Sequence, residues 1–137
     1  MEEACRGEIR EMIVLDANYI LRYFLRDDEA MFLQAKAVIG QKACLLLTEV
    51  MDEVVYVLQG VYKVPKKEIV QVLADLVSLS SVSMYESKSV MFETLRLFGS
   101  DNLDFVDCCF CALKERYEVK SFDKKLMKCV GSGVDRG

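Results

Sequence analysis

The stretch "MIVLDANYILRYF", Met12 to Phe24, decides the fold. It opens with an apolar run over 12–15 that is typical of a buried strand, and Asp16 ends that run. From Asn18 to Leu25 the apolar residues recur at helical spacing. The pattern predicts a strand that passes directly into a helix, with a carboxylate at the junction.

Strand-like and helix-like segments alternate along the rest of the chain. The apolar runs "ACLLLT", "SVSMYE" and "EVKSF" predict strands at 43–48, 81–86 and 118–122. Helical periodicity predicts further helices at 31–39, from Thr48 to about Val61, and at 66–79, 88–99, 104–117 and 124–130. This alternation predicts one α/β domain, with a mainly parallel sheet of four or five strands flanked by helices.

The composition suits a single globular domain. The chain has 137 residues, and 53% hydrophobic content is ample for a core. We expect the domain to occupy 12–130, after an N-terminal extension over 1–11 and before a flexible, glycine-rich tail over 131–137. Charged residues interrupt every apolar run before it could cross a bilayer, and the charged start does not resemble a secretory signal. The sequence therefore predicts a cytoplasmic protein that does not enter a membrane.

The chain contains no histidine. This absence excludes Ser-His and Cys-His nucleophile pairs, histidine acid–base catalysis and imidazole-ligated zinc. Any chemistry must come from carboxylates, lysines, hydroxyls or thiols. The net charge of −4 also argues against a loose, purely electrostatic attachment to nucleic acid, although it leaves room for a local basic rim.

The six cysteines are expected to be reduced thiols. The chain is rich in core residues, and Cys108, Cys109 and Cys111 crowd into one predicted helix, where they cannot pair with one another. A metal–thiolate site built from Cys44 and Cys129 is an alternative, but no CxxC spacing supports it.

Carboxylates recur where predicted strands end. Asp16 ends the first strand and Asp123 the last, Asp104 and Asp107 lie one helical turn apart, and three acids fall within 49–53. Ligands of parallel sheets bind beyond the carboxyl ends of the strands. Acids that converge there repel one another unless a cation lies among them, and such oxygen ligands suit Mg²⁺ or Mn²⁺.

Four of these acids also have a simpler explanation, which is that they stabilise the N-terminus of a helix. Asp16 and Asp104 stand where a side chain caps the N-terminus of a helix. Glu49 and Asp52 lie in a first helical turn, where the helix dipole favours acids. Several acids in register with an α/β topology are harder to explain by capping alone.

The chain resembles the PIN domain family, and within it the toxin ribonucleases of the VapC type. The resemblance runs from about Met12 to Val130 and rests on "VLDANYILRYFLRDD", "EVVYVLQGVYKVPKKEI", "LDFVDCCFCAL" and "KSFDKKL". It implies that the four metal-binding catalytic acids of the family fall on Asp16, Glu53, Asp107 and Asp123. It also implies accessory roles for Asp104 and for Asn18, the latter through the D-x-N opening.

Two features depart from the family pattern. Ala17 stands where Thr or Ser usually follows the first aspartate, which removes one hydroxyl. Cysteines replace the small aliphatic residues that usually follow the third acid. Neither change removes a ligand, so the resemblance still implies activity.

The resemblance implies a ribonuclease that hydrolyses RNA phosphodiester bonds with Mg²⁺ or Mn²⁺, acts as a homodimer and is inhibited by a small antitoxin protein. Basic residues near the site are candidates for holding the RNA backbone, namely Arg22, Arg26, Lys120, Lys124 and Lys125. A PIN-like module that binds RNA or protein without cutting is the alternative. A phosphotransfer receiver domain fits less well, because "LDAN" offers one acid where a receiver has a pair.

The helix after the second strand also yields a prediction about its three acids. Glu49 and Glu53 are four residues apart and share a face, whereas Asp52 is rotated by roughly 100° from Glu53. We therefore expect Glu53 to be the metal ligand, Glu49 a neighbour of it, and Asp52 to be dispensable.

Overall fold

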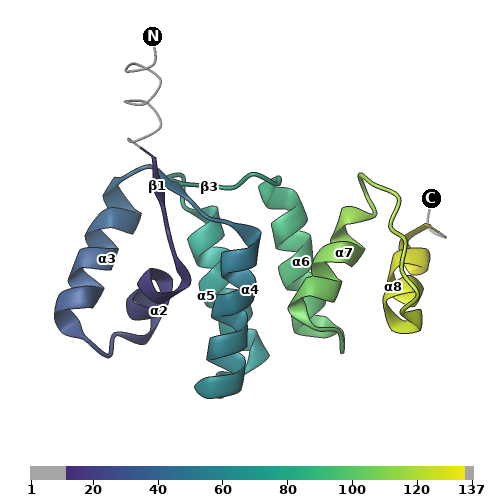
Figure 1. Cartoon of the computed structure of the whole chain (residues 1–137), viewed down its shortest axis with the longest axis horizontal. Helices are drawn as coiled ribbons and strands as arrows, with labels where there is room; N and C mark the ends of the chain where they lie inside the picture. The colour runs from purple at the N-terminus through teal and green to yellow at the C-terminus, as the bar shows by residue number, and fades with distance from the viewer. Residues whose placement is uncertain (1–11, 135–137) are drawn as a thin grey trace, which may run out of the picture.

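The structure, a computed structural model, describes residues 12–134 (Figure 1). The predicted extension over 1–11 lies outside the described residues, as does the end of the predicted tail over 135–137. Between these limits the chain alternates short strands and longer helices, as the sequence predicts.

The sheet is parallel and has three strands within the described residues. Its strands are β1 (Ile13–Val14), β2 (Cys44–Leu45) and β3 (Val82–Ser83), with β2 in the middle. Ile13 lies opposite Cys44, which in turn lies opposite Val82. The parallel pairing confirms the predicted architecture, whereas the predicted number of four or five strands is wrong for the part of the chain described.

The predicted strand at 118–122 is absent from the structure, although this segment is fully described. A strand needs a partner strand for its backbone hydrogen bonds, and β-type composition alone does not supply one. Figure 1 shows this segment on the opposite side of the molecule from β1. The Phe122 side chain is fully exposed, and Lys120 pairs with Glu118 at 3.3 Å on the surface.

The helices match the predicted ones, except that the helix predicted over 104–117 ends at Leu113 and continues as turns. In chain order they are α2 (Ala17–Leu25), α3 (Glu29–Gln41), α4 (Thr48–Tyr56) with the π-helical turn η1 (Val57–Val61), α5 (Lys66–Ser78), α6 (Lys88–Ser100), α7 (Phe105–Leu113) and α8 (Lys124–Val134). Helix α8 continues to Val134, so residues 131–134, expected in the tail, are helical. Figure 1 shows α3 near one end of the long axis and α8 at the other. No described helix is long and apolar enough to cross a membrane.

Buried apolar residues directly follow strands β1 and β2. Leu15 and Leu46 directly follow β1 and β2, and both are almost completely buried. The residue after Leu15 is Asp16, which is exposed. Burial of Leu15 therefore fixes the end of β1 in the core, and the next residue, Asp16, lies at the surface. Met51 of α4 and Phe98 of α6 are buried in the same core as Leu15 and Leu46.

Candidate functional site

Three of the predicted site acids stand at the N-termini of helices. Each accepts a hydrogen bond from a backbone N–H in the first turn, as an N-cap residue does. The distances from Oδ1 to the amide nitrogen are 2.8 Å from Asp16 to Tyr19, 2.9 Å from Asp104 to Asp107 and 2.9 Å from Asp123 to Leu126. The capping role is confirmed, but each bond uses one of two carboxylate oxygens and so leaves room for a second role.

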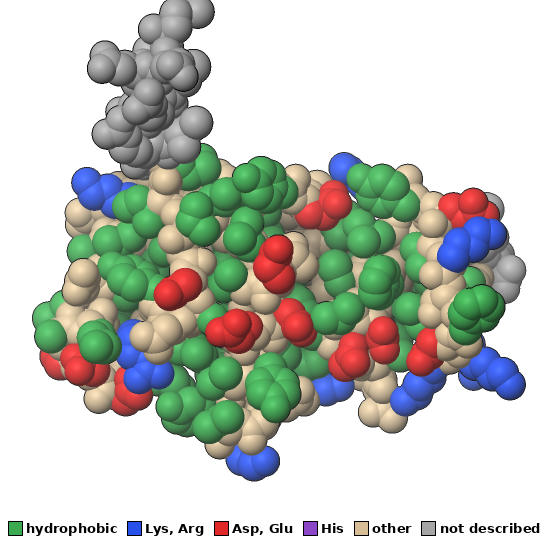
Figure 2. All heavy atoms as spheres, viewed as in Figure 1, with side chains coloured by type: hydrophobic (Ala, Val, Ile, Leu, Met, Phe, Trp, Pro, Cys, Tyr) green, Lys and Arg blue, Asp and Glu red, His purple; other side chains and the backbone are tan. Residues whose placement is uncertain are grey.

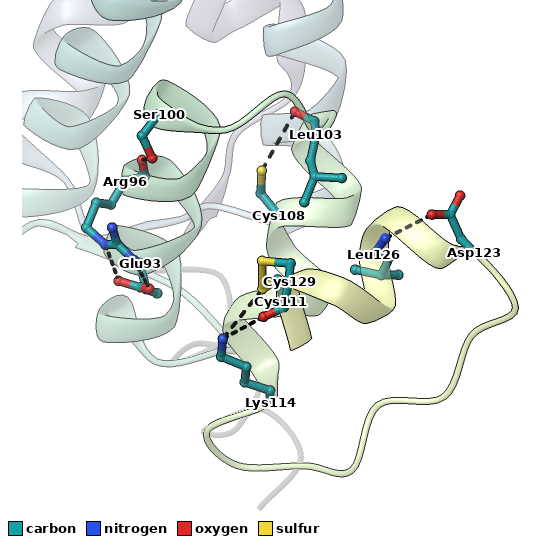
Figure 3. Close-up of a disulfide and its surroundings, with 10 residues drawn as sticks. All are labelled: Glu93, Arg96, Ser100, Leu103, Cys108, Cys111, Lys114, Asp123, Leu126 and Cys129. Atoms are coloured by element: carbon teal, nitrogen blue, oxygen red, sulfur yellow. Dashed lines mark hydrogen bonds and ion pairs between the residues drawn. A yellow bond between two sulfur atoms is a disulfide. The ribbon is translucent and has the colours of Figure 1, made fainter. Parts of the chain in front are cut away.

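Asp107 lies in the first turn of α7 and is partly buried. Burial raises the pKa of its carboxyl group, and the negative charges of Asp104 and Asp123 raise that pKa further. The ammonium group of Lys125 acts in the opposite direction. The ends of α7 and α8 thus bring three of the predicted acids into one electrostatic group, and Figure 3 shows Asp123 at the start of α8.

Helix α4 contributes a fourth acid to this group, and that acid is Asp52. Its carboxyl group is partly buried, and its pKa is raised first by burial and then by the charge of Asp104. Glu49 and Glu53 are exposed. The sequence predicts that Asp52 is dispensable, and this stays a prediction; the residue borders the buried residues Met51 and Val55 of the same helix and so lies at the edge of the core.

The described acidic side chains do not converge closely enough to form a metal site. Among residues 12–134 as far as they are described, no three acidic or thiol side chains are gathered closely enough to hold an ion. Figure 2 shows acidic side chains in a broken row across the face that carries α2, α4 and α7. Asp16 stands at the edge of β1, beside a groove of about 350 Å³ that Ile13, Val14 and Tyr19 help to line.

The donor chemistry nevertheless fits a divalent cation. All the candidate ligands are carboxylates, which are the groups that Mg²⁺ and Mn²⁺ prefer. Burial raises the pKa of Asp107 most, and the repulsion from Asp104 and Asp123 that adds to it is a repulsion that a bound cation would relieve. Asp16, Glu53, Asp107 and Asp123 therefore have the chemistry expected of divalent-metal ligands. Of these four, the structure shows an electrostatic interaction between Asp107 and Asp123 only.

The candidate basic residues divide into three groups. Lys125 donates through Nζ to the Asn102 carbonyl at 3.1 Å and acts on Asp107, so it lies beside the acids. Arg22 forms an ion pair with Asp27, and Arg26 lies 3.9 Å from the centroid of the Phe32 ring. These contacts tie Arg22 and Arg26 to neighbouring side chains, and a contact of either with RNA stays a prediction. Lys120 pairs with Glu118, and Lys124 is exposed at the start of α8.

The prediction that all six cysteines are reduced is wrong, because Cys111 and Cys129 form a disulfide (Figure 3). The proposed pairing of Cys44 with Cys129 in a metal–thiolate site is wrong for the same reason. Cys44 is buried, and its Sγ donates to the Lys42 carbonyl at 3.4 Å. The sequence signal for the disulfide was weak: both cysteines fall at apolar positions of successive helices, a pattern that core packing alone also produces.

Comparison with known proteins identifies the family. The chain matches the PIN domain family over residues 13–129, which is nearly all of the described domain. Comparisons with curated proteins and with solved structures give no match. PIN domains are generally nucleases that need divalent metal ions. The match, the parallel α/β fold and the acids at the helix N-termini lead to one conclusion: the chain belongs to the PIN domain family.

Proposed function

We propose that this protein is a metal-dependent endoribonuclease that hydrolyses phosphodiester bonds in RNA. One observation carries the proposal: α7 and α8 bring Asp104, Asp107 and Asp123 near enough that, in addition to burial, the charges of Asp104 and Asp123 raise the pKa of Asp107. Repulsion between carboxylates costs stability, and Lys125 opposes it here in part; shifted pKa values of this kind cluster at functional sites. Membership of a family of nucleases supplies the reaction class.

The residues that would hold Mg²⁺ or Mn²⁺ are Asp16, Glu53, Asp107 and Asp123. When bound, the ion would lower the pKa of a water molecule and offset charge developing on the phosphate. Neighbouring side chains would position these ligands. Asp104 holds the first turn of α7 through its hydrogen bond to the Asp107 amide and so orients the Asp107 side chain.

Substrate contacts would come from groups beside these acids. Lys125 lies close enough to lower the pKa of Asp107, which places a cation where an RNA phosphate would approach. Asn18 is exposed in the first turn of α2, two residues after Asp16, and can orient that carboxylate. Lys120 and Lys124 lie on the exposed segment that precedes and begins α8.

We further propose that the protein is the toxin of a toxin–antitoxin pair of the VapC type, acts as a homodimer in the cytoplasm, and is inhibited by a small antitoxin. These proposals rest on the sequence resemblance of the four motifs. Light scattering after size exclusion would report the mass of the species in solution, and a monomer at all concentrations would oppose the dimer. Co-expression with the product of a small neighbouring reading frame would test for inhibition.

Cleavage of a labelled RNA by the purified protein, with Mn²⁺ or with EDTA, tests the activity. The variants Asp16→Asn, Glu53→Gln, Asp107→Asn and Asp123→Asn should each lose metal-dependent cleavage while they remain folded. Asp75→Asn is a matched control, because Asp75 is an exposed acid on α5 that pairs with Gln71 away from the proposed site. If two or more of the four variants cut RNA at the parent rate, the site assignment is wrong.

A module that binds RNA or protein without cutting is the second candidate. One observation favours it: the described acids include no group of three that is ready to hold an ion. Ala17 adds to it, since the family hydroxyl is missing there. Under this alternative, a gel-shift assay would detect bound RNA that stays intact with Mn²⁺, and the four variants would not differ from the parent.

A further inference from the structure

The disulfide between Cys111 and Cys129 joins the two helices that carry coupled acids. Cys111 lies one helical turn beyond Asp107 on α7, and Cys129 lies beyond Asp123 on α8. We propose that this disulfide is a redox-controlled latch that holds α8, and with it Asp123, against α7 when oxidised and releases it when reduced. The effect on catalysis rests on the proposed nuclease function, whereas the effect on α8 does not.

Helix α8 depends on α7 for its position. Of the helices and strands in the described part of the chain, α7 is the one with which α8 makes extensive contact. The connection over 114–123 contains no helix or strand and therefore does not brace α8. Over 124–131, where the side chains of α8 are described, Leu126 and Val130 are buried in the core, and Met127 and Cys129 pack against it. The disulfide adds a covalent link to this noncovalent contact with α7.

The position of Asp123 follows from that of α8. The Asp123 carboxylate accepts a hydrogen bond from the Leu126 amide at 2.9 Å, so the acid and the first turn move together (Figure 3). A helix that is tied at Cys129 carries its N-terminus with it. The separation between Asp123 and Asp107 is therefore set by the disulfide as well as by packing.

The surroundings of the disulfide suit reversible thiol–disulfide exchange. Cys111 is buried, whereas Cys129 is only partly buried, so a reductant meets the Cys129 sulfur first. The ammonium group of Lys114 lies 3.8 Å from the Cys111 Sγ and donates to the Cys129 carbonyl at 3.0 Å (Figure 3). A positive charge beside a sulfur favours its anionic form, which is the form released when a disulfide is cleaved.

The other described thiols are poorly placed to compete. Cys44 and Cys108 are buried, and Cys109 is partly buried on α7. Restricted access slows thiol–disulfide exchange, so these three thiols would exchange slowly with the disulfide. Among the described cysteines, Cys111 and Cys129 are therefore the pair that would exchange with a reductant.

The reductant is a dithiol, and the reaction balances as follows. One thiolate of the dithiol bonds to the Cys129 Sγ, the bond between the two cysteine sulfurs breaks, and its electron pair leaves on the Cys111 Sγ. The second thiol of the reductant then displaces Cys129 and closes its own disulfide. Two electrons and two protons pass from the dithiol to the protein, which leaves two cysteine thiols.

Hydrogen–deuterium exchange on the oxidised and dithiol-treated protein tests the latch. Reduction should speed exchange of the α8 amides by about tenfold while the amides of α5 keep their rates, because local opening exposes one helix only. Reoxidation should restore the protection. Equal α8 exchange in the two states, or no bond between Cys111 and Cys129 in peptide maps of the oxidised protein, would overturn the proposal.

Variants separate this pair from the other cysteines. Cys129→Ala should exchange at the reduced rate in α8 whatever the redox state, whereas Cys109→Ala, a partly buried thiol on α7, should respond to dithiol as the parent does. Should Cys129→Ala fail to fold, the reversible treatment of the parent still decides the question. RNA cleavage measured in parallel should fall on reduction. An α8 response without cleavage in either state supports the latch and refutes the nuclease, whereas cleavage with no α8 response does the reverse.

Discussion

Substitution of Asp104 separates the two roles that the structure gives to this residue. Asp104 caps α7 through the bond to the Asp107 amide, and its charge raises the pKa values of Asp107 and Asp52. Asn caps helices about as well as Asp, so Asp104→Asn removes the charge and keeps the cap. Ala removes both. The pair of variants therefore measures the charge and the cap independently.

The expected magnitudes differ for the two variants. Asp104→Ala should lower the free energy of unfolding at pH 7 by about 1 kcal/mol, the usual effect of losing a cap. For a protein with a urea m-value of about 2 kcal/mol/M this moves the unfolding midpoint by roughly 0.5 M. Asp104→Asn should change stability by less than about 0.5 kcal/mol, since relief of repulsion offsets a weaker interaction with the helix dipole.

The pH dependence has a definite sign. The folded-state pKa of Asp107 is above its ordinary value of 3.8. Its contribution to stability is therefore fully present below pH 3.8 and is lost as the pH rises through the raised value. Asp104→Asn should lower that pKa, so less stability is lost across the same window. An NMR titration of the Asp107 carboxyl carbon gives the pKa directly, and an unchanged value in Asp104→Asn would refute the coupling of the two carboxylates.

Three further predictions concern the site. Glu53→Gln should abolish RNA cleavage and Asp52→Asn should retain it, as measured on a labelled RNA with Mn²⁺; the opposite result would move the α4 ligand to Asp52. Mg²⁺ or Mn²⁺ at 100 times its dissociation constant should stabilise the folded protein by about 2.7 kcal/mol in thermal unfolding, and Asp107→Asn should lose most of that gain; equal gains in both proteins would place the ion elsewhere. Lys125→Met should raise the pKa of Asp107 in the NMR titration, since the ammonium group now lowers it; a fall would contradict the described position of Lys125.

Much of the fold was predictable because helical periodicity and capping are local. The segment 66–79 repeats apolar residues at helical spacing, and α5 covers almost the same range. Asp16 and Asp104 stand immediately before apolar helices, which predicts their caps. The absence of a strand at 118–122 was not predictable in the same way, because strand formation depends on whether another strand lies beside the segment.

The site was predictable in its residue types and less so in its geometry. The spacing of Asp104 and Asp107 gives their contact, since both lie in one helical turn. The coupling of Asp52 to Asp104 joins α4 to α7, and a helical wheel drawn for α4 alone contains no information on where α7 lies. The bond between Cys111 and Cys129 likewise depends on how α8 packs on α7.

Within residues 12–134, β1 pairs with a strand on one side only, and its other edge bears on how this protein behaves at high concentration. Ile13 and Leu15 donate their amides to the β2 side, so the backbone groups of Val14 point outward, and its side chain is 59% exposed. An unpaired apolar edge is a template on which other chains can assemble into aggregates. Here the strand is only two residues long, so an incoming chain gains few hydrogen bonds. Brevity of the strand thus protects solubility at a place where the side chains alone would not.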